Sequence, residues 1–334
     1  MTASGIDGLP NEAPSHPAAG SLDASSEHLR ARLSALETRV HDAVARRAST
    51  DPRPDDPFRG LYLSDQQALD LVDGRSPAWG PQPDADLAGV GACEAAADEA
   101  AAAGADIRLR LLGDAFDLDL VDTELLLIAL APDLDPRFES LYGYLQDDVT
   151  RRRATIGLAL RLALLGLADP DARRRLSTGS SLVGGGLLLL EDRDRPFLAR
   201  TLRASDRATA FLLGDTAPDH ELARVIDTSS VVDRQSASPA LARALAAGAR
   251  LTYLRELAGS AAATTAVSSI ALVGSRSLAV DASRVGSTEG ARALIGAALL
   301  EARLRFAVLV VGPIDPLLEH GTAAIGDLAD SGWP

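Results

Sequence analysis

The chain has 334 residues, 46% of them hydrophobic, and a formal net charge of −14 at pH 7. This acidity opposes long-range attraction to a phosphate backbone, and no uninterrupted apolar run approaches the roughly 18 residues that a membrane-spanning helix requires. All 33 basic residues are Arg, which excludes Lys-dependent chemistry such as a Schiff base or the phosphate-binding Lys of a P-loop.

The amino-terminal residues 1–25 are polar, acidic and rich in Pro, so we expect a disordered leader that is not a secretory signal. Cys93 is the only cysteine and cannot form an internal disulfide. These features predict a cytoplasmic protein without membrane association.

Residues 26–105 are expected to form a helical amino-terminal region with Pro-rich linkers. Within it, residues 28–47 have an apolar stripe that would pack on its own domain or, if exposed, join a partner helix. A linker over 48–60, a helix after Ser64, a loop over 75–84 and an Ala-rich helix over 86–105 complete this region.

A block of three short helices follows a further helical stripe over 107–116. Asp122 is a candidate cap for the first helix, and Pro132 is expected to stop it. Asp135 and Pro136 predict the start of the second helix, whose stripe contains Phe138, Leu141, Tyr142 and Leu145. The third helix is predicted over Thr155–Leu165.

The periodicity then changes to that of strands. Two strands over 187–190 and 197–202, with a turn at 192–194, predict a β-hairpin, and Ser205 or Asp206 can cap one more helix that ends at Gly214. Helices followed by a two-stranded ribbon are the plan of a winged helix. We therefore expect a winged-helix domain over 106–245.

The last part, 246–334, alternates strands and helices. Strands are predicted at 251–254, 277–281 and 306–311, and helices at 264–272 and 288–304. This βαβαβ order indicates half of a doubly wound nucleotide-binding sheet. The predicted fold class is thus mainly α with an α/β part.

The run LAPDLDPRFESLYGYLQDDVTRRRATIGLALRL, together with the later FLLG, resembles the winged-helix domain at the amino end of a family of AAA-type ATPases. Some members of that family are associated with contractile injection systems. The resemblance implies that a degenerate AAA domain follows, and then an active one. Here the degenerate domain would be incomplete, since its strand between the first and third strands has not occurred by Pro334.

A P-loop, G-x-x-x-x-G-K-[ST], holds phosphates with backbone N–H groups and a Lys, and holds Mg²⁺ with a hydroxyl. Its signature positions fall here on Glu256, Ala261, Ala262 and Ala263, so all four are lost. Only Gly259 and Ser260, with Thr264 just after the motif, retain the look of the family's loop.

The acidic motif of an AAA domain would place Asp-Glu after the apolar strand, followed by Ile-Asp-Ala-Leu. Gly312 and Pro313 occupy the two carboxylate positions, while Ile314, Asp315 and Leu317 match the tail. We expect no catalytic residues, no metal and no cofactor; ATP and Mg²⁺ would enter only if the degenerate site or a missing domain bound them.

Three further features have alternative interpretations. Arg151, Arg152 and Arg153 precede the third helix and could contact DNA, but neutralisation of Asp147 and Asp148 is favoured. The run Gly184–Gly186 could hold a phosphate, but a turn before a strand is favoured. Asp281 lies where a dinucleotide fold would bind a ribose, and a capping role is favoured.

Three functions remain open. The first is a non-catalytic adaptor or regulatory part of an AAA-type ATPase, which contacts proteins such as an AAA oligomer or injection-system components. The second is a fragment of an active AAA ATPase whose catalytic domain is missing. The third is a winged-helix DNA-binding regulator, although a nucleic-acid partner is disfavoured by the charge.

Overall fold

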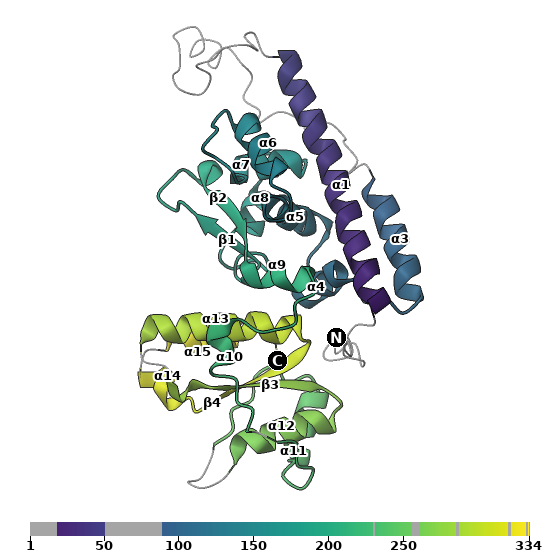
Figure 1. The fold of residues 1–334 in the computed structure, drawn as a ribbon. Coiled ribbons are helices and arrows are strands. Elements are labelled where there is room, and N and C mark those ends of the chain that lie inside the picture. Colours follow the sequence, from purple (N-terminus) through teal and green to yellow (C-terminus); the bar gives the residue numbers. More distant parts are fainter. Residues whose placement is uncertain are drawn as a thin grey trace. The chain divides into compact units, whose positions relative to one another are not determined.

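The computed structural model describes residues 19–50, 89–229, 231–255, 261–284, 287–319, 322–331 and 333. The chain divides into two compact units at Asp215–Thr216, and each is treated by itself below. The described residues are mainly helical, with one antiparallel and one parallel two-stranded sheet, which confirms the predicted fold class (Figure 1). Residues 1–18 of the expected leader, residues 51–60 of the expected linker, the helix after Ser64 and the loop over 75–84 lie outside the described residues. Residues 48–50, which were expected to belong to the linker, are helical.

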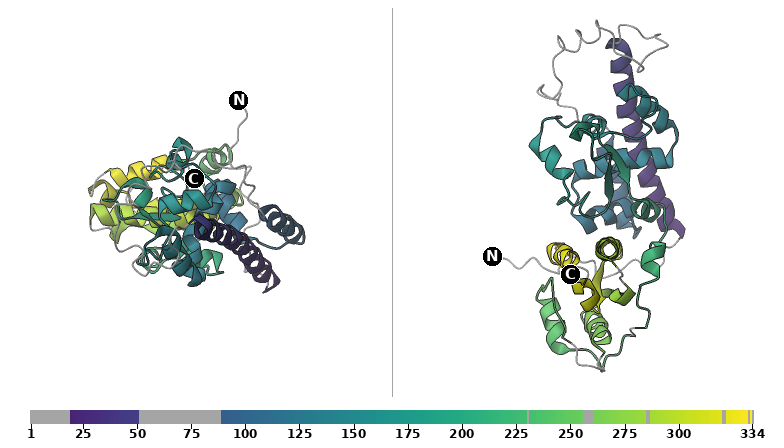
Figure 2. Two further views of the ribbon diagram at one scale, coloured as in Figure 1. Left: turned by 90° about the horizontal axis from the view of Figure 1, so that it is seen from above. Right: turned by 90° about the vertical axis from the view of Figure 1, so that its left-hand side faces the viewer.

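The amino-terminal unit contains a long helix, α1 (Ala19–Thr50), beside α3 (Val90–Ala102). The helix begins at Ala19 rather than at His28 as expected, and its stripe of Leu29, Leu36 and Val40 is buried. It contacts α3 to α7 of the same unit and runs along them in the views of Figures 1 and 2. The prediction that this stripe packs on its own domain is confirmed.

Five helices continue this unit: α4 (Arg108–Phe116), α5 (Leu120–Leu134), α6 (Arg137–Gln146), α7 (Ile156–Leu162) and α8 (Pro170–Arg175). Helix α5 is the centre of the core, because every residue from Thr123 to Pro132 is buried. Its cap is Asp119 rather than Asp122. The Asp119 carboxylate accepts a hydrogen bond from the Asp122 N–H, and the Asp122 carboxylate accepts one from the Asp119 N–H, which together form a capping box.

Pro132 does not stop α5 as predicted, because the helix runs on to Leu134. Proline has no N–H, so the Ile128 carbonyl four residues earlier loses its usual helical donor. The hydroxyl of Tyr142, from α6, donates to that carbonyl at 3.0 Å. Tyr142 is fully buried, and burial raises the pKa of its hydroxyl. The second helix thus supplies the hydrogen bond that proline removes from the first.

The hairpin consists of β1 (Leu188–Glu191) and β2 (Thr201–Ala204), paired antiparallel from Leu188–Ala204 to Glu191–Thr201. The second strand starts later than predicted, because Pro196 leads into a 3-10 turn, η1 (Phe197–Ala199). Thr155, just before α7, bridges β2 at Thr201. Helix α9 (Asp206–Leu212) follows, with Ser205 as its cap as expected.

The carboxyl-terminal unit contains two parallel strands, β3 (Arg276–Asp281) and β4 (Ala307–Gly312), in register from Arg276–Ala307 to Asp281–Gly312. The prediction of a strand at 251–254 is wrong: this segment is irregular and forms no ladder. The free side of β3 is instead bridged antiparallel by Ile226 at Val280. One βαβ unit is present among the described residues rather than βαβαβ.

Helices cover both faces of this small sheet. Helix α13 (Thr288–Leu304) packs on one face, where Leu278 and Val280 meet Ala298 and Ala302. Helices α11 (Pro239–Ala246) and α12 (Ala262–Leu272) cover the other, with Val308 and Val310 against Leu241, Leu245 and Ile270. The short helices α10 (His220–Ala223), η2 (Ala282–Arg284), α14 (Asp315–Glu319) and α15 (Ala323–Asp330) complete the unit.

Tyr142→Phe is expected to lower the free energy of unfolding by about 1–3 kcal/mol, since it leaves the buried Ile128 carbonyl without its donor. Pro132→Ala restores a backbone N–H at the position that normally donates to this carbonyl. The tyrosine substitution should therefore cost less in the Pro132→Ala background, with a coupling of about 1 kcal/mol. Urea denaturation of the four members of this cycle measures the coupling, and strictly additive effects would contradict it.

Candidate functional site

A cavity of about 720 Å³ opens in the carboxyl-terminal unit. It lies along β4, beneath α11 and α12, and is closed on another side by the irregular segment 249–255. Its volume falls within the range of about 300–1,000 Å³ that is typical of ligand pockets. Its apolar lining comprises, among others, Leu241, Leu245, Leu254, Ala266, Ile270, Val308 and Val310.

Residues from both segments that were aligned with nucleotide motifs line this cavity. Ala262 and Ala263 come from the first turn of α12, Gly312 ends β4, and Pro313 follows it. Asp315, at the start of α14, lines the cavity as well.

The remaining positions of the degenerate loop are placed differently. Ala261 precedes α12 without a side-chain cap, and Thr264 belongs to the helix but is not part of the cavity wall. Glu256, Gly259 and Ser260 lie outside the described residues. Two buried hydroxyls of α12 hold the segment 233–238. Ser268 accepts a hydrogen bond from the Asp233 N–H at 2.9 Å, and Ser269 accepts one from the Ser238 N–H at 2.8 Å.

The charges around the cavity do not suit a triphosphate. Asp227, Asp281 and Asp315 contribute carboxylates to its wall, and Arg250 and Arg255 contribute the cations. Asp281 accepts the N–H of Ser283 at 2.9 Å, as expected for a cap. Among the described residues, no group of three or more His, Cys, Asp or Glu side chains is arranged to hold a metal ion.

Sequence analysis did not identify Asp227 as part of this wall. It follows the short β-branched pair Val225 and Ile226, whose backbone pairs with β3: the Asp227 N–H donates to the Ala279 carbonyl at 2.9 Å. A short apolar run before Asp-Thr-Ser is typical of a strand that enters a turn, and this signal could have located the segment.

The arginine run of the winged helix is neutralised by carboxylates. Arg151 pairs with Asp148, Arg152 with Glu139 and Arg153 with Asp133. The predicted pairing is therefore correct for Asp148, whereas Asp147 pairs with Arg47 of α1. The run borders a smaller cavity of about 310 Å³ that also contains Arg195, itself within 4.0 Å of Asp192.

Helix α7, which would enter the major groove in a DNA-binding winged helix, is not free to do so. All of its residues except Arg161 are buried, and it contacts α1, α5, α6 and η1. Base readout requires exposed side chains along such a helix. The geometry of α7 therefore disfavours DNA recognition.

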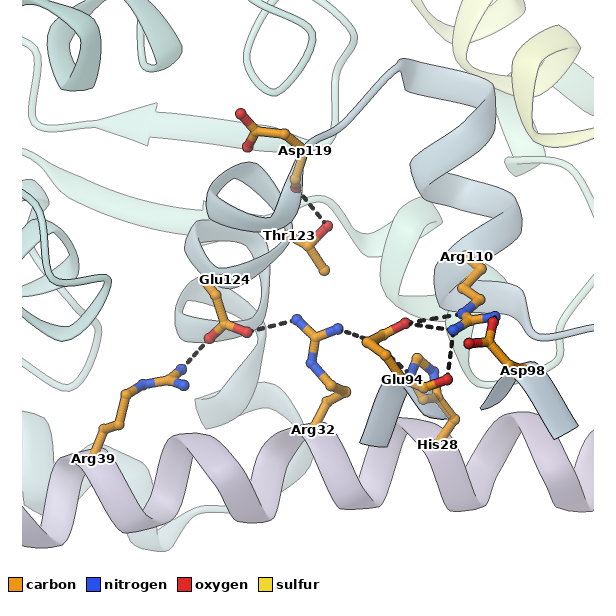
Figure 3. A network of polar contacts seen from close by, with 9 residues as sticks. All are labelled: His28, Arg32, Arg39, Glu94, Asp98, Arg110, Asp119, Thr123 and Glu124. Atoms are coloured by element: carbon orange, nitrogen blue, oxygen red, sulfur yellow. Dashed lines mark hydrogen bonds and ion pairs between the residues drawn. The ribbon is translucent and has the colours of Figure 1, made fainter. Parts of the chain in front are cut away.

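A buried ion network connects α1 and α3 to the core (Figure 3). Arg32 and Arg39 of α1 both donate to Glu124 of α5, which is completely buried; the Arg32–Glu124 distance is 2.6 Å. Arg32 also contacts Glu94 of α3, which Arg110 of α4 reaches at 2.9 Å. Arg110 pairs further with Asp98 at 2.7 Å.

His28 closes the network at its amino-terminal end, with Nε2 at 3.0 Å from Glu94. Burial lowers the pKa of His28, and the hydrogen bond to Glu94 opposes this effect only in part. Burial alone would raise the pKa of Glu94, but the bonds from His28 and Arg110 outweigh it and lower that pKa. In the folded protein a neutral imidazole therefore lies beside an ionised carboxylate.

The run Gly184–Gly186 forms a tight turn rather than a phosphate cradle. A Cβ at Gly185 would come within 2.2 Å of the Ser181 carbonyl oxygen and 2.9 Å of the Phe116 ring. Close packing, which only glycine permits, accounts for this residue. His41 and His220 are exposed and contact only neighbouring carboxylates, Asp42 and Glu221.

Three helices, a bridged hairpin and a following helix, packed as described, define a winged-helix protein. A comparison with family models agrees: the model described as "Winged helix domain, variant" matches residues 12–226. Because this match covers more than half of the chain, the protein belongs to that winged-helix family. No curated protein and no solved structure matches the chain. Among the described residues, no helix is long and apolar enough to cross a membrane.

Glu124→Gln is expected to lower the free energy of unfolding by about 3–5 kcal/mol, because it leaves the cations of Arg32 and Arg39 buried without their shared carboxylate. Glu37→Gln is the matched control. Glu37 belongs to α1, the helix that carries Arg32 and Arg39. Its side chain is half exposed where it pairs with Arg137, and loss of this ion pair should cost under about 1 kcal/mol. Urea denaturation followed by circular dichroism measures both, and equal small effects would contradict a structural role for Glu124.

Acidification from pH 7 to about 5.5 is expected to reduce stability through His28. The unfolded chain binds a proton near the ordinary pKa of 6.5, whereas the folded chain does so only at lower pH. The unfolded state therefore gains protons first, and stability falls as pH falls through this window. The lowered pKa of Glu94 acts in the same direction at lower pH.

Urea midpoints at the two pH values test this prediction. His28→Gln should flatten the decline, while His41→Gln, which changes an exposed histidine of the same helix, should leave it intact. A decline that persists unchanged in His28→Gln would assign it to other groups.

Proposed function

We propose that the chain is the non-catalytic amino-terminal part of an AAA-type ATPase, a cytoplasmic adaptor that contacts other proteins and neither binds nor hydrolyses ATP. The observation that carries this proposal is the composition of the cavity where both degenerate motifs meet. Ala262, Ala263, Gly312 and Pro313 lie where a phosphate site would have its cation, its hydroxyl and its two acids.

The physical argument rests on charge. A triphosphate with its Mg²⁺ requires a cation and donors at the amino end of the helix, and carboxylates that are aimed at the metal. The chain has no lysine, and its three wall aspartates would repel phosphate oxygens rather than neutralise them. The cavity retains the shape of a nucleotide-binding fold without the groups that hold the nucleotide.

The winged helix supports the adaptor role in a second way. Its third helix is buried and its arginine run is paired with acids, which leaves protein contact as the better use of this domain. The association with an AAA oligomer or with a contractile injection system rests on the sequence resemblance alone. The proposal that an active AAA domain lies elsewhere in the parent protein has the same basis.

Isothermal titration of the full chain with Mg·ATP is expected to give no heat beyond dilution, and phosphate-release assays should give no turnover. The reason is that Ala262 occupies the position of the P-loop cation and that three carboxylates line the cavity. A clear isotherm with micromolar affinity would overturn the proposal that the chain does not bind ATP. Turnover of ATP by the purified chain would instead support the alternative of an active ATPase.

A further inference from the structure

Within the part of the chain that the structure describes, no strand lies beside the outer edge of β4. Parallel pairing with β3 uses the hydrogen-bonding groups on one side of β4 only, and those on the other side point away from the sheet. Among the described residues, the one partner on that side is the indole of Trp333, whose Nε1 donates to the Ala307 carbonyl at 2.9 Å. Within Val308–Gly312, the alternate residues that do not pair with β3 therefore present backbone donors and acceptors at this edge.

The cavity runs along this same edge. Val308, Leu309, Val310 and Val311 are four consecutive residues of β4, and all line the cavity. Consecutive side chains of a strand point to opposite faces, so a space that touches all four must lie beside the strand rather than above one face. The segment 249–255 lines the cavity as well, which makes the space a slot with β4 on one side.

The lining specifies what could enter the slot. Val308, Val310, Leu254 and Ile270 are apolar and require apolar side chains at alternate positions of the occupant. Trp333 borders the slot at the beginning of β4. Asp281 and Asp315 lie at the other end, where β3 and β4 finish, and favour a basic residue there.

We propose that β4 binds an extended segment of a partner protein by strand addition, with alternate apolar side chains of that segment in the slot and a basic residue beside Asp281 and Asp315. A second folded copy of this chain is a poorer fit, because its own β4 edge is recessed behind the same walls. The proposal specifies the partner surface of the adaptor function and rests on its protein-contact part, but it is independent of whether ATP binds.

Two acetylated and amidated peptides serve as probes, each with alternating Val and Thr and one Arg, placed at the carboxyl end in one and at the amino end in the other. The protein is the full chain with Trp79→Phe, so that Trp333 at the slot is the remaining tryptophan. Trp79 lies outside the described residues. We expect one peptide to change the Trp333 fluorescence saturably and to bind more tightly than the other.

N-methylation of the peptide distinguishes binding through backbone hydrogen bonds from binding through apolar side-chain contacts alone. Methyl groups are placed on the Val amides in one version of the tighter peptide and on the Thr amides in another, since these two sets point to opposite edges of a strand. Loss of two or three hydrogen bonds should weaken at least one version by about tenfold or more. Full retention of affinity by both versions overturns the proposal.

The rim is tested by Asp315→Asn, which should weaken the tighter peptide by about two- to fivefold, as expected for an exposed ion pair. Asp330→Asn is the matched control: this aspartate ends α15 and does not line the slot, so binding should be unchanged. Equal affinity of Asp315→Asn and the parent chain contradicts the predicted orientation and overturns this part of the proposal.

Hydrogen exchange completes the test. Those amides of 308–312 that do not donate to β3 should exchange more slowly when the peptide is bound. Protection of this outward-pointing set already present in the free chain would show that another part of this chain or a second copy occupies the edge, and sedimentation distinguishes these two; either result overturns the proposal. Absence of binding by both peptides at millimolar concentration overturns it too, while a silent Mg·ATP titration of the same preparation would leave the adaptor function standing.

Discussion

The interaction on which the amino-terminal unit depends is the shared carboxylate of Glu124. It is buried in the middle of α5, the helix at the centre of the core, and it accepts from two arginines of a helix that lies about 90 residues earlier in the sequence. A carboxylate cannot be buried there without cations, and the cations cannot be buried without it. This mutual requirement fixes which face of α1 lies on the core.

Specificity, rather than net stability, is the better account of this network. Three guanidinium groups face three carboxylates, those of Glu94, Asp98 and Glu124, so the charges balance. Yet Arg39 keeps its Nε and Nη1 without a partner among the described residues. Apolar residues would pack α1 without that cost. The requirement that each buried charge meet its partner, however, favours one register between α1, α3 and α5, and in that register α1 contacts α7.

The sequence allowed the winged helix to be predicted because its signals are local. Ser205 and Thr155 cap the helices that were expected to begin there, and the hairpin follows the helices in order. Pro132 was misjudged because its consequence is not local. The donor that replaces the lost N–H comes from Tyr142 on another helix, and no spacing rule contains that contact. The ion-pair partners of Arg32 and Arg39 could not be predicted from the sequence for the same reason.

The carboxyl-terminal unit illustrates a different limit. Ala262, Ala263, Gly312 and Pro313 were selected from residue identities, and all four line the same cavity. The strand predicted at 251–254 fails, although its residues favour strands, because strand formation needs a neighbour to pair with and β4 does not reach it.

The same geometry explains why the slot exists. The segment 251–254, whose residues favour strands, and β4, which has one unpaired edge, both line this cavity. They form no ladder with each other. An exposed apolar edge is normally shielded by charge, proline or a cover. Here the edge is recessed behind 249–255 and flanked by aspartates, which protects it from other folded sheets but leaves it accessible to a single extended chain.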